Sequence, residues 1–117
     1  MDRTQRWRTR HPDKILLQNL RHRAPDAELD ESWVRKKLAA GVCEVSGIAF
    51  QIATPGEGKN PFSPSIDRID RTKGYTFQNC RMVVFIFNLA RNSWKDSDVL
   101  LLAEALVRRR AENMKAK

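Results

Sequence analysis

Hydrophobic and polar residues follow a helical period in the first third of the chain. Between Asp13 and Arg23, three leucines fall on one side of a helix and basic residues on the other, which predicts an amphipathic helix. A second helix is expected over about 31–40, because Asp30 is a suitable N-cap and Gly41 a suitable C-terminal stop. The apolar faces of these two helices are expected in the core.

The period then changes to that of strands. Residues 42–52 are rich in strand-forming side chains, and Ser46-Gly47 is a turn signal between them, so a short hairpin is expected there. Further along, the pattern predicts, in order, a loop over 54–64, a short strand over 65–70, a turn over 72–74 and a second strand within 75–83.

The remaining chain again has a helical period. One helix is expected from Val84 onward, and a last helix over 96–113, where Val99, Leu102 and Leu106 recur at helical spacing and are expected to face the core. The fold class is therefore α+β, with short hairpins flanked by N-terminal and C-terminal helices. We expect 1–117 to be one domain, divided into a flexible basic arm (1–11), a helical part (12–41), a central part (42–94) and the C-terminal helix (96–113).

Composition adds a functional indication. Apolar residues make up 41% of the chain, and no apolar run is long enough to cross a bilayer, so a cytoplasmic protein without a membrane partner is expected. The net charge of +8 favours a polyanionic partner, although basic charge can also serve solubility alone. The excess lies at both ends of the chain, around Trp7 and at Arg108–Arg110.

Two cysteines are too few for a four-ligand zinc site. Cys43 and Cys80 are flanked by apolar residues and are interpreted as buried small hydrophobes. Ser46 stands three residues after Cys43, where a zinc-binding C-x-x-C pair would need a second cysteine, so no structural zinc is expected. The hairpin over 42–52 is instead expected to be held by the packing of Val45, Ile48 and Phe50.

The segment Ser65–Trp94, SIDRIDRTKGYTFQNCRMVVFIFNLARNSW, is the most informative part of the chain. It resembles the HNH, or ββα-metal, nuclease motif, and residues 42–94 would then form the ββα-metal core. Asp67-Arg68-Ile69 lies where that family has Asp-His-Ile. Gly74 matches the turn glycine, Asn79 the asparagine that ties the loop, and Asn88 the metal ligand on the helix. The preceding GVCEVSGIAF and the basic helix around 16–23 are also similar to small phage-type members, so the resemblance covers most of the chain.

The resemblance implies a divalent cation, Mg²⁺ or Mn²⁺, held by Asp67 and Asn88. Carboxylate and amide oxygens suit these hard cations. A cation with few protein ligands keeps positions open for water and for the scissile phosphate. The alternative for the same residues is structural: Asp67 caps a turn and Asn88 is an ordinary polar helix residue.

Arg68 is a departure from the family pattern. The histidine at this position deprotonates the attacking water, and an arginine cannot do so. Arg68 could instead bind a phosphate oxygen and stabilise the charge of the transition state. The base would then be Asp70, Tyr75 or a hydroxide on the metal, and Arg68 and Asp70 could also simply form an ion pair. His22 is a weaker candidate that is expected to face solvent or DNA.

The function expected from these features is a metal-dependent DNA endonuclease or nickase of phage or mobile-element character. One alternative is a catalytically silent DNA-binding module that keeps the fold, and another is an RNA-directed nuclease. DNA is the expected partner, and the protein could act as a monomer or a homodimer. The residues expected to contact nucleic acid are Arg3, Arg6, Arg8, Arg10, Arg71, Lys73 and Arg91.

Overall fold

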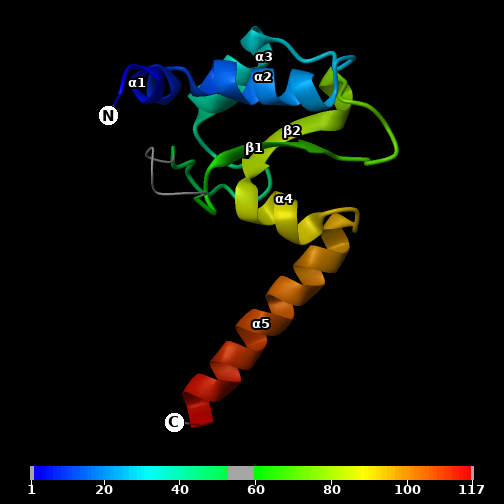
Figure 1. Ribbon diagram of the computed structural model, residues 1–117. Helices are drawn as coiled ribbons and strands as arrows, with labels where there is room; N and C mark the ends of the chain where they lie inside the picture. Colours follow the sequence, from blue (N-terminus) through cyan, green and yellow to red (C-terminus); the bar gives the residue numbers. More distant parts are fainter. Residues whose placement is uncertain (1, 53–59, 117) are drawn as a thin grey trace.

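The protein has a mixed α+β fold, in which a two-stranded antiparallel hairpin is flanked by helices (Figure 1). The computed structural model describes residues 2–52 and 60–116. Within these residues, no helix has both the length and the apolar character needed to span a membrane. The elements are α1 (Arg3–Arg10), α2 (Pro12–Arg23), α3 (Glu31–Ala40), β1 (Pro64–Arg68), the 3-10 helix η1 (Phe77–Asn79), β2 (Cys80–Val84), α4 (Phe85–Arg91) and α5 (Asp96–Ala116).

Helices α2 and α3 form as the sequence pattern predicts. Leu17 and Leu20 of α2 are fully buried, on the apolar side of that helix. At α3 the carboxylate of Asp30 accepts a hydrogen bond from the Trp33 N–H at 2.9 Å, and Gly41 ends the helix with a left-handed φ of 78°. The local capping signals therefore fix both ends of α3.

Residues 1–11 were predicted to be a flexible arm, and this prediction is wrong for most of the segment. Residues 3–10 form α1, which a capping box begins: the Gln5 N–H donates to the Asp2 carboxylate, and the Asp2 N–H donates to the Gln5 side chain. This reciprocal pair satisfies two of the free N–H groups at the helix start. Asp2 and Gln5 have the spacing of a capping box in the sequence, but the many arginines of this segment led to its interpretation as an arm.

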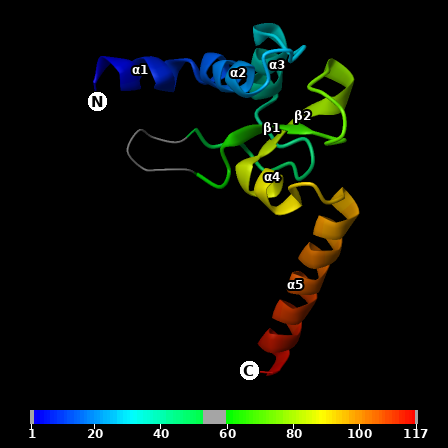
Figure 2. The same ribbon diagram turned by 45° about the vertical axis from the view of Figure 1, so that its right-hand side comes forward.

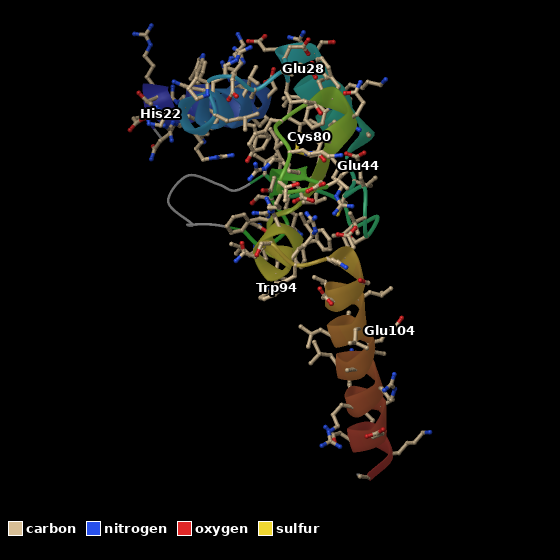
Figure 3. All side chains as sticks on the ribbon, turned by 90° about the vertical axis from the view of Figure 1, so that its right-hand side faces the viewer. His22, Glu28, Glu44, Cys80, Trp94 and Glu104 are labelled. Atoms are coloured by element: carbon tan, nitrogen blue, oxygen red, sulfur yellow. The ribbon has the colours of Figure 1, made fainter. Side chains whose placement is uncertain are left out.

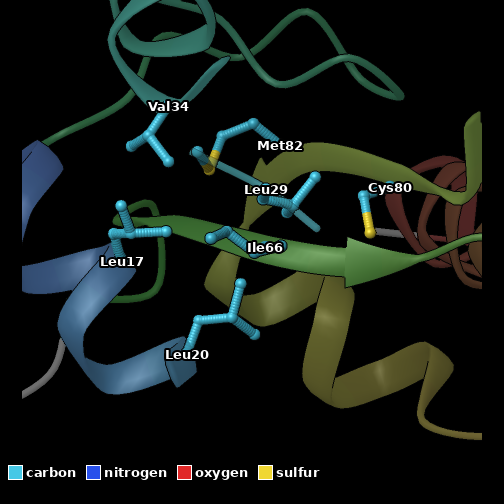
Figure 4. Close-up of a cluster of buried hydrophobic side chains, with 7 residues drawn as sticks. All are labelled: Leu17, Leu20, Leu29, Val34, Ile66, Cys80 and Met82. Atoms are coloured by element: carbon cyan, nitrogen blue, oxygen red, sulfur yellow. The ribbon is translucent and has the colours of Figure 1, made fainter. Parts of the chain in front are cut away.

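The hairpin lies between two helical layers, with α2 and α3 on one face and α4 on the other (Figures 1 and 2). Alternation along the strands gives the faces different characters. Ile66 and Met82, which are register partners, point toward α2 and α3 and join the main apolar cluster (Figure 4). Asp67 and Arg81, the next register pair, meet on the α4 side. One face of the hairpin therefore builds the core and the other carries charge.

The hairpin predicted over 42–52 is reduced to a single isolated bridge between Val42 and Ala49. The packing expected to hold it is also wrong in part, because Val45 and Ile48 are 41% and 44% exposed. The segment is anchored instead by Cys43, which is buried against β2 and packs with the partly buried Phe50. The predicted loop over 54–64 lies mostly outside the described residues, and its last residue already begins β1.

Helix α5 projects away from the rest of the molecule (Figures 1 and 2). It contains no buried residue, so the prediction that Val99, Leu102 and Leu106 face the core is wrong. Their helical spacing was read correctly, but spacing alone cannot show what an apolar face packs against. Trp94, just before α5, is likewise 64% exposed (Figure 3).

Candidate functional site

Asp67 lies in β1 and is wholly buried on the face that α4 covers. Its cross-strand partner Arg81 approaches one carboxylate oxygen, with Nε 2.9 Å from Oδ2. Arg91 of α4 donates from Nη1 to both oxygens, at 2.9 and 3.1 Å. The buried negative charge is therefore neutralised by two guanidinium groups, which is the condition for a carboxylate to be tolerated at this depth.

Arg91 joins three elements through the same side chain. Besides Asp67, it donates to the backbone carbonyls of Arg68 and Ile69 at the end of β1, and its Nε lies 2.8 Å from Oδ1 of Asp96 at the start of α5. It is only 4% exposed. The prediction that Arg91 contacts nucleic acid is therefore corrected: its guanidinium is committed to the interior.

Asp96 completes this charged network. It accepts two hydrogen bonds from Arg81, at 2.8 and 2.9 Å. Those bonds hold the pKa of the Asp96 carboxyl below its usual value, and they raise the pKa of Arg81. Two carboxylates and two guanidinium groups thus connect the hairpin with α4 and with the beginning of α5.

A third arginine lies between the two residues expected to bind a metal. Arg71 Nη2 donates to Oδ1 of Asn88 at 2.7 Å and lies 3.6 Å from Oδ1 of Asp67. The orientation of the Asn88 amide is fixed, because its Nδ2 donates to Ser65 Oγ at 2.8 Å. Two side-chain oxygens, 21 positions apart in the sequence, therefore face the same cationic nitrogen.

Arg71 is the least firmly held of the three arginines around Asp67. Its side chain is 29% exposed, compared with 13% for Arg81 and 5% for Arg91. Among the described residues Arg71 donates one hydrogen bond, to Asn88, whereas Arg81 donates three and Arg91 four. Arg71 can therefore leave this position at a smaller cost than the other two.

The donor set fits a hard divalent cation on one condition. An amide oxygen and a carboxylate oxygen that face a common positive charge are suitable ligands for Mg²⁺ or Mn²⁺. Within residues 2–52 and 60–116, no group of three or more His, Cys, Asp or Glu side chains is placed to hold a metal. Of these side-chain types in the described part of the chain, Asp67 alone is placed beside Asn88, so a cation would have to displace Arg71 and share Asp67 Oδ1 with Arg91 Nη1, which lies 2.9 Å from it.

Beside Asn88, a surface pocket of about 380 Å³ opens along β1. Its cationic wall is formed by Arg68, Arg71 and Arg23, the last residue of α2. Arg68 stacks on the ring of Tyr75, with its guanidinium carbon 4.8 Å from the ring centroid, and donates to the Lys73 carbonyl at 3.2 Å. The structure therefore does not place Arg68 in the ion pair with Asp70 that strand alternation allowed.

Asp70 does not line this pocket. Its carboxylate accepts hydrogen bonds from the hydroxyl and the N–H of Thr72, at 2.6 and 2.9 Å. These bonds lower the pKa of Asp70, which makes it a weaker base. Of the two side chains expected as candidate bases, Tyr75 lines the pocket and Asp70 does not.

Asn79 ties the loop between the strands. Its Oδ1 accepts from the Asp70 N–H at 2.9 Å, and its Nδ2 donates to the carbonyls of Asp70 and Gly74, each at 2.9 Å. These bonds close the loop that carries Arg71 onto the residue before β2. At Gly74 a Cβ would meet no atom within 4 Å and φ is not positive, so the structure shows no steric need for glycine there.

The other predicted nucleic-acid contacts lie on the surface. Lys73 is exposed in the loop, and His22 is exposed on α2 (Figure 3). The four arginines of the arm are exposed on α1 and do not line the pocket: Arg3, Arg6, Arg8 and Arg10.

Sequence reasoning missed four residues of the site: Arg23, Ser65, Arg81 and Asp96. No sequence signal existed for Arg81, because pairing the strands around the predicted turn at 72–74 would place Asn79 opposite Asp67, whereas the observed partner is Arg81. Arg23 was recognised only as an outer residue of an amphipathic helix. Asp96 was predicted as the first residue of the last helix, but its carboxylate is bound by Arg81 and Arg91.

Comparison of this chain with protein-family models, with curated proteins and with solved structures gave no match.

Proposed function

We propose that the protein is a metal-dependent DNA endonuclease or nickase. The observation that carries the proposal is the convergence of Asp67 Oδ1 and Asn88 Oδ1 on one cationic nitrogen at the edge of an arginine-lined pocket. A divalent cation at this position would supply the positive charge that phosphodiester hydrolysis needs on the phosphate and the leaving oxygen. The net charge of +8 supports a polyanionic substrate.

The arginine side chains of the pocket are placed to bind the phosphate. Arg68 and Arg23 are placed to bind non-bridging oxygens of a phosphate that enters along β1. Stacking on Tyr75 holds the Arg68 guanidinium in place, so less conformational freedom is lost on binding. Arg71, once it leaves Asp67 and Asn88, can bind the same phosphate and stabilise the charge of the transition state.

We assign to Tyr75 the role of orienting the water molecule that attacks the phosphate. It lines the pocket together with Asn88, whereas Asp70 is engaged by Thr72 away from it. Its hydroxyl can accept a hydrogen bond from a water molecule and orient it. Tyr75→Phe should therefore lower the cleavage rate and leave DNA affinity almost unchanged.

The test is plasmid cleavage with Mg²⁺ or Mn²⁺, and with EDTA as the metal-free arm. Asn88→Ala removes one of the two ligand oxygens without unpairing a buried charge, and should lower cleavage by about 100-fold or more. Asn113→Ala, an exposed substitution on α5, is the matched control and should cleave like the parent chain. No cleavage by the folded parent chain with either metal would overturn the proposal.

A second candidate is a catalytically silent DNA-binding module. The specific observation in its favour is that Arg71 already fills the place between Asp67 and Asn88, with Arg68 in place of a basic histidine. This alternative predicts DNA binding with no cleavage by the parent chain. Arg68→His separates the two candidates, because cleavage that appears only in this variant would favour the silent module.

A further inference from the structure

We propose that α5 is a self-association helix that pairs antiparallel with α5 of a second copy of this chain. The proposal concerns a surface outside the arginine-lined pocket, and it does not depend on the proposed function. It begins from an apolar face on a helix that projects away from the fold (Figure 2).

The apolar side chains of α5 gather on one side of the helix. At about 100° per residue, seven of them fall within less than half of the circumference. We call this set the α5 stripe: Val99, Leu100, Leu102, Ala103, Leu106, Val107 and Met114, with Arg110 on the same side between Val107 and Met114. The opposite side carries Glu104, Arg108, Glu112 and Lys115, with Leu101 as its one large apolar residue.

The α5 stripe is not covered within the described residues. Leu102 is 57% exposed, Leu106 63% and Val107 68%. Helix α5 meets the rest of the molecule at its start, where it contacts α4 and where Arg81 and Arg91 bind Asp96. From Val99 to Val107 this face is uninterrupted, and an apolar face that the described residues leave uncovered marks a contact surface.

The distribution of charge along α5 favours a second copy, in antiparallel orientation. The first part of the helix carries Asp96, Asp98 and Glu104, and the last part carries Arg108–Arg110 and Lys115, with Glu112 as its acidic residue. An antiparallel pair brings the acidic part of each helix alongside the basic part of the other. A parallel pair would place Arg108–Arg110 against the same residues of the second copy, which is repulsive.

The side chains also suit a two-fold axis near Ala103. An antiparallel pair centred there places Val99 opposite Val107 and Leu100 opposite Leu106, while the small Ala103 side chains allow close approach at the centre. A buried Leu or Val side chain removes roughly 60–100 Å² from water. Met114 lies beyond the overlap of the two helices, because the position opposite it, 92, precedes α5. The five large side chains from Val99 to Val107 in each copy would then bury about 600–1,000 Å² in total, which is the size of a weak interface.

The first test is the concentration dependence of the molar mass of the full chain, measured by sedimentation or by light scattering. The monomer has a mass of 13.5 kDa, and we expect this value to double as the concentration rises. Leu106→Glu should weaken association by at least about tenfold, because each copy would place a charge in the interface. Leu101→Glu makes the same change on the opposite side of the helix, at 68% exposure, and should leave association unchanged.

The second test determines the orientation. Val99→Cys and Val107→Cys chains, mixed under mild oxidation, should cross-link with each other more than either does with itself. Circular dichroism of each variant establishes that α5 remains helical. A parent chain that stays monomeric at all concentrations, equal effects of the two glutamate substitutions, or self-linking of each cysteine variant would overturn the proposal.

Discussion

The buried carboxylate of Asp67 is surrounded by arginine side chains. Three guanidinium groups face its carboxylate, and two of them, on Arg81 and Arg91, are nearly buried. The carboxylate is a counter-charge for these buried guanidinium groups, and they are counter-charges for the carboxylate. Asp67 is therefore a structural centre of the hairpin in addition to any part it takes in binding a metal.

This arrangement predicts the effect of Asp67→Ala on stability. The substitution removes the buried counter-charge of Arg91 and Arg81 and leaves them the half-exposed Asp96, so the free energy of unfolding should fall by about 3–5 kcal/mol. Glu31→Ala is the comparison, because Glu31 pairs with Arg35 at the surface, with 44% and 59% exposure, and its loss should cost about 1 kcal/mol or less. Urea unfolding measures both values.

Equal losses in the two variants would show that the buried network contributes no more than a surface pair. The same reasoning explains why Asn88→Ala is the better probe of the proposed metal site. Asn88 accepts from Arg71 and donates to Ser65, and its removal leaves Asp67 paired with Arg81 and Arg91. A loss of cleavage in that variant would therefore not follow from unfolding.

At the scale of elements, the sequence was most informative where local signals and burial agree. Helix α3 has a capping aspartate, a terminal glycine and a buried Val34, and its predicted bounds are those observed. The segment 42–52 has strand-forming residues but not the alternating burial of a strand, because Val45 and Ile48 face solvent. Strand propensity reflects how well a side chain packs on a half-buried sheet surface, and residues 42–52 do not form such a surface.

The candidate site divides in the same way. The sequence predicted that the hairpin and α4 would bring Asp67 and Asn88 together, since a turn and a short connection leave few other arrangements. It did not predict that Arg71 would lie between them, because a long side chain in a loop has many rotamers. It also did not predict Arg23 in the pocket, which depends on how the end of α2 packs beside β1.

Helix α1 permits a test of how much a capping box contributes to the stability of a short helix. It has eight residues, which is too short for stability in isolation, and its capping box supplies two side-chain hydrogen bonds. Asp2→Ala should cost about 1 kcal/mol of local stability, so that the amides of Gln5 and Arg6 exchange faster. Hydrogen exchange read by NMR measures this, with the α3 amides as an internal control. Unchanged exchange at Gln5 would show that tertiary contacts hold α1.

At the scale of the whole molecule, the basic side chains are spread over an elongated shape. The described chain is elongated, with principal extents of 52, 38 and 22 Å. The exposed arginines of α1, the arginine-lined pocket and the end of α5 lie on different elements. A nucleic acid bound at the pocket would therefore meet only part of the +8 charge, and the rest would act at longer range.

If the protein binds DNA, as we propose, the salt dependence of that binding distinguishes the pocket from this general charge. Each phosphate that the protein neutralises contributes about −0.9 to the slope of log K against log salt. A chain with Arg23→Gln and Arg68→Gln should therefore show a slope less steep by about 2, as measured by fluorescence anisotropy with a short duplex. A chain with Arg35→Gln and Lys36→Gln loses the same formal charge on α3, outside the pocket, and should keep nearly the parent slope. If the two chains lose equal slope, DNA binding follows total charge, and the pocket is not where the phosphate binds.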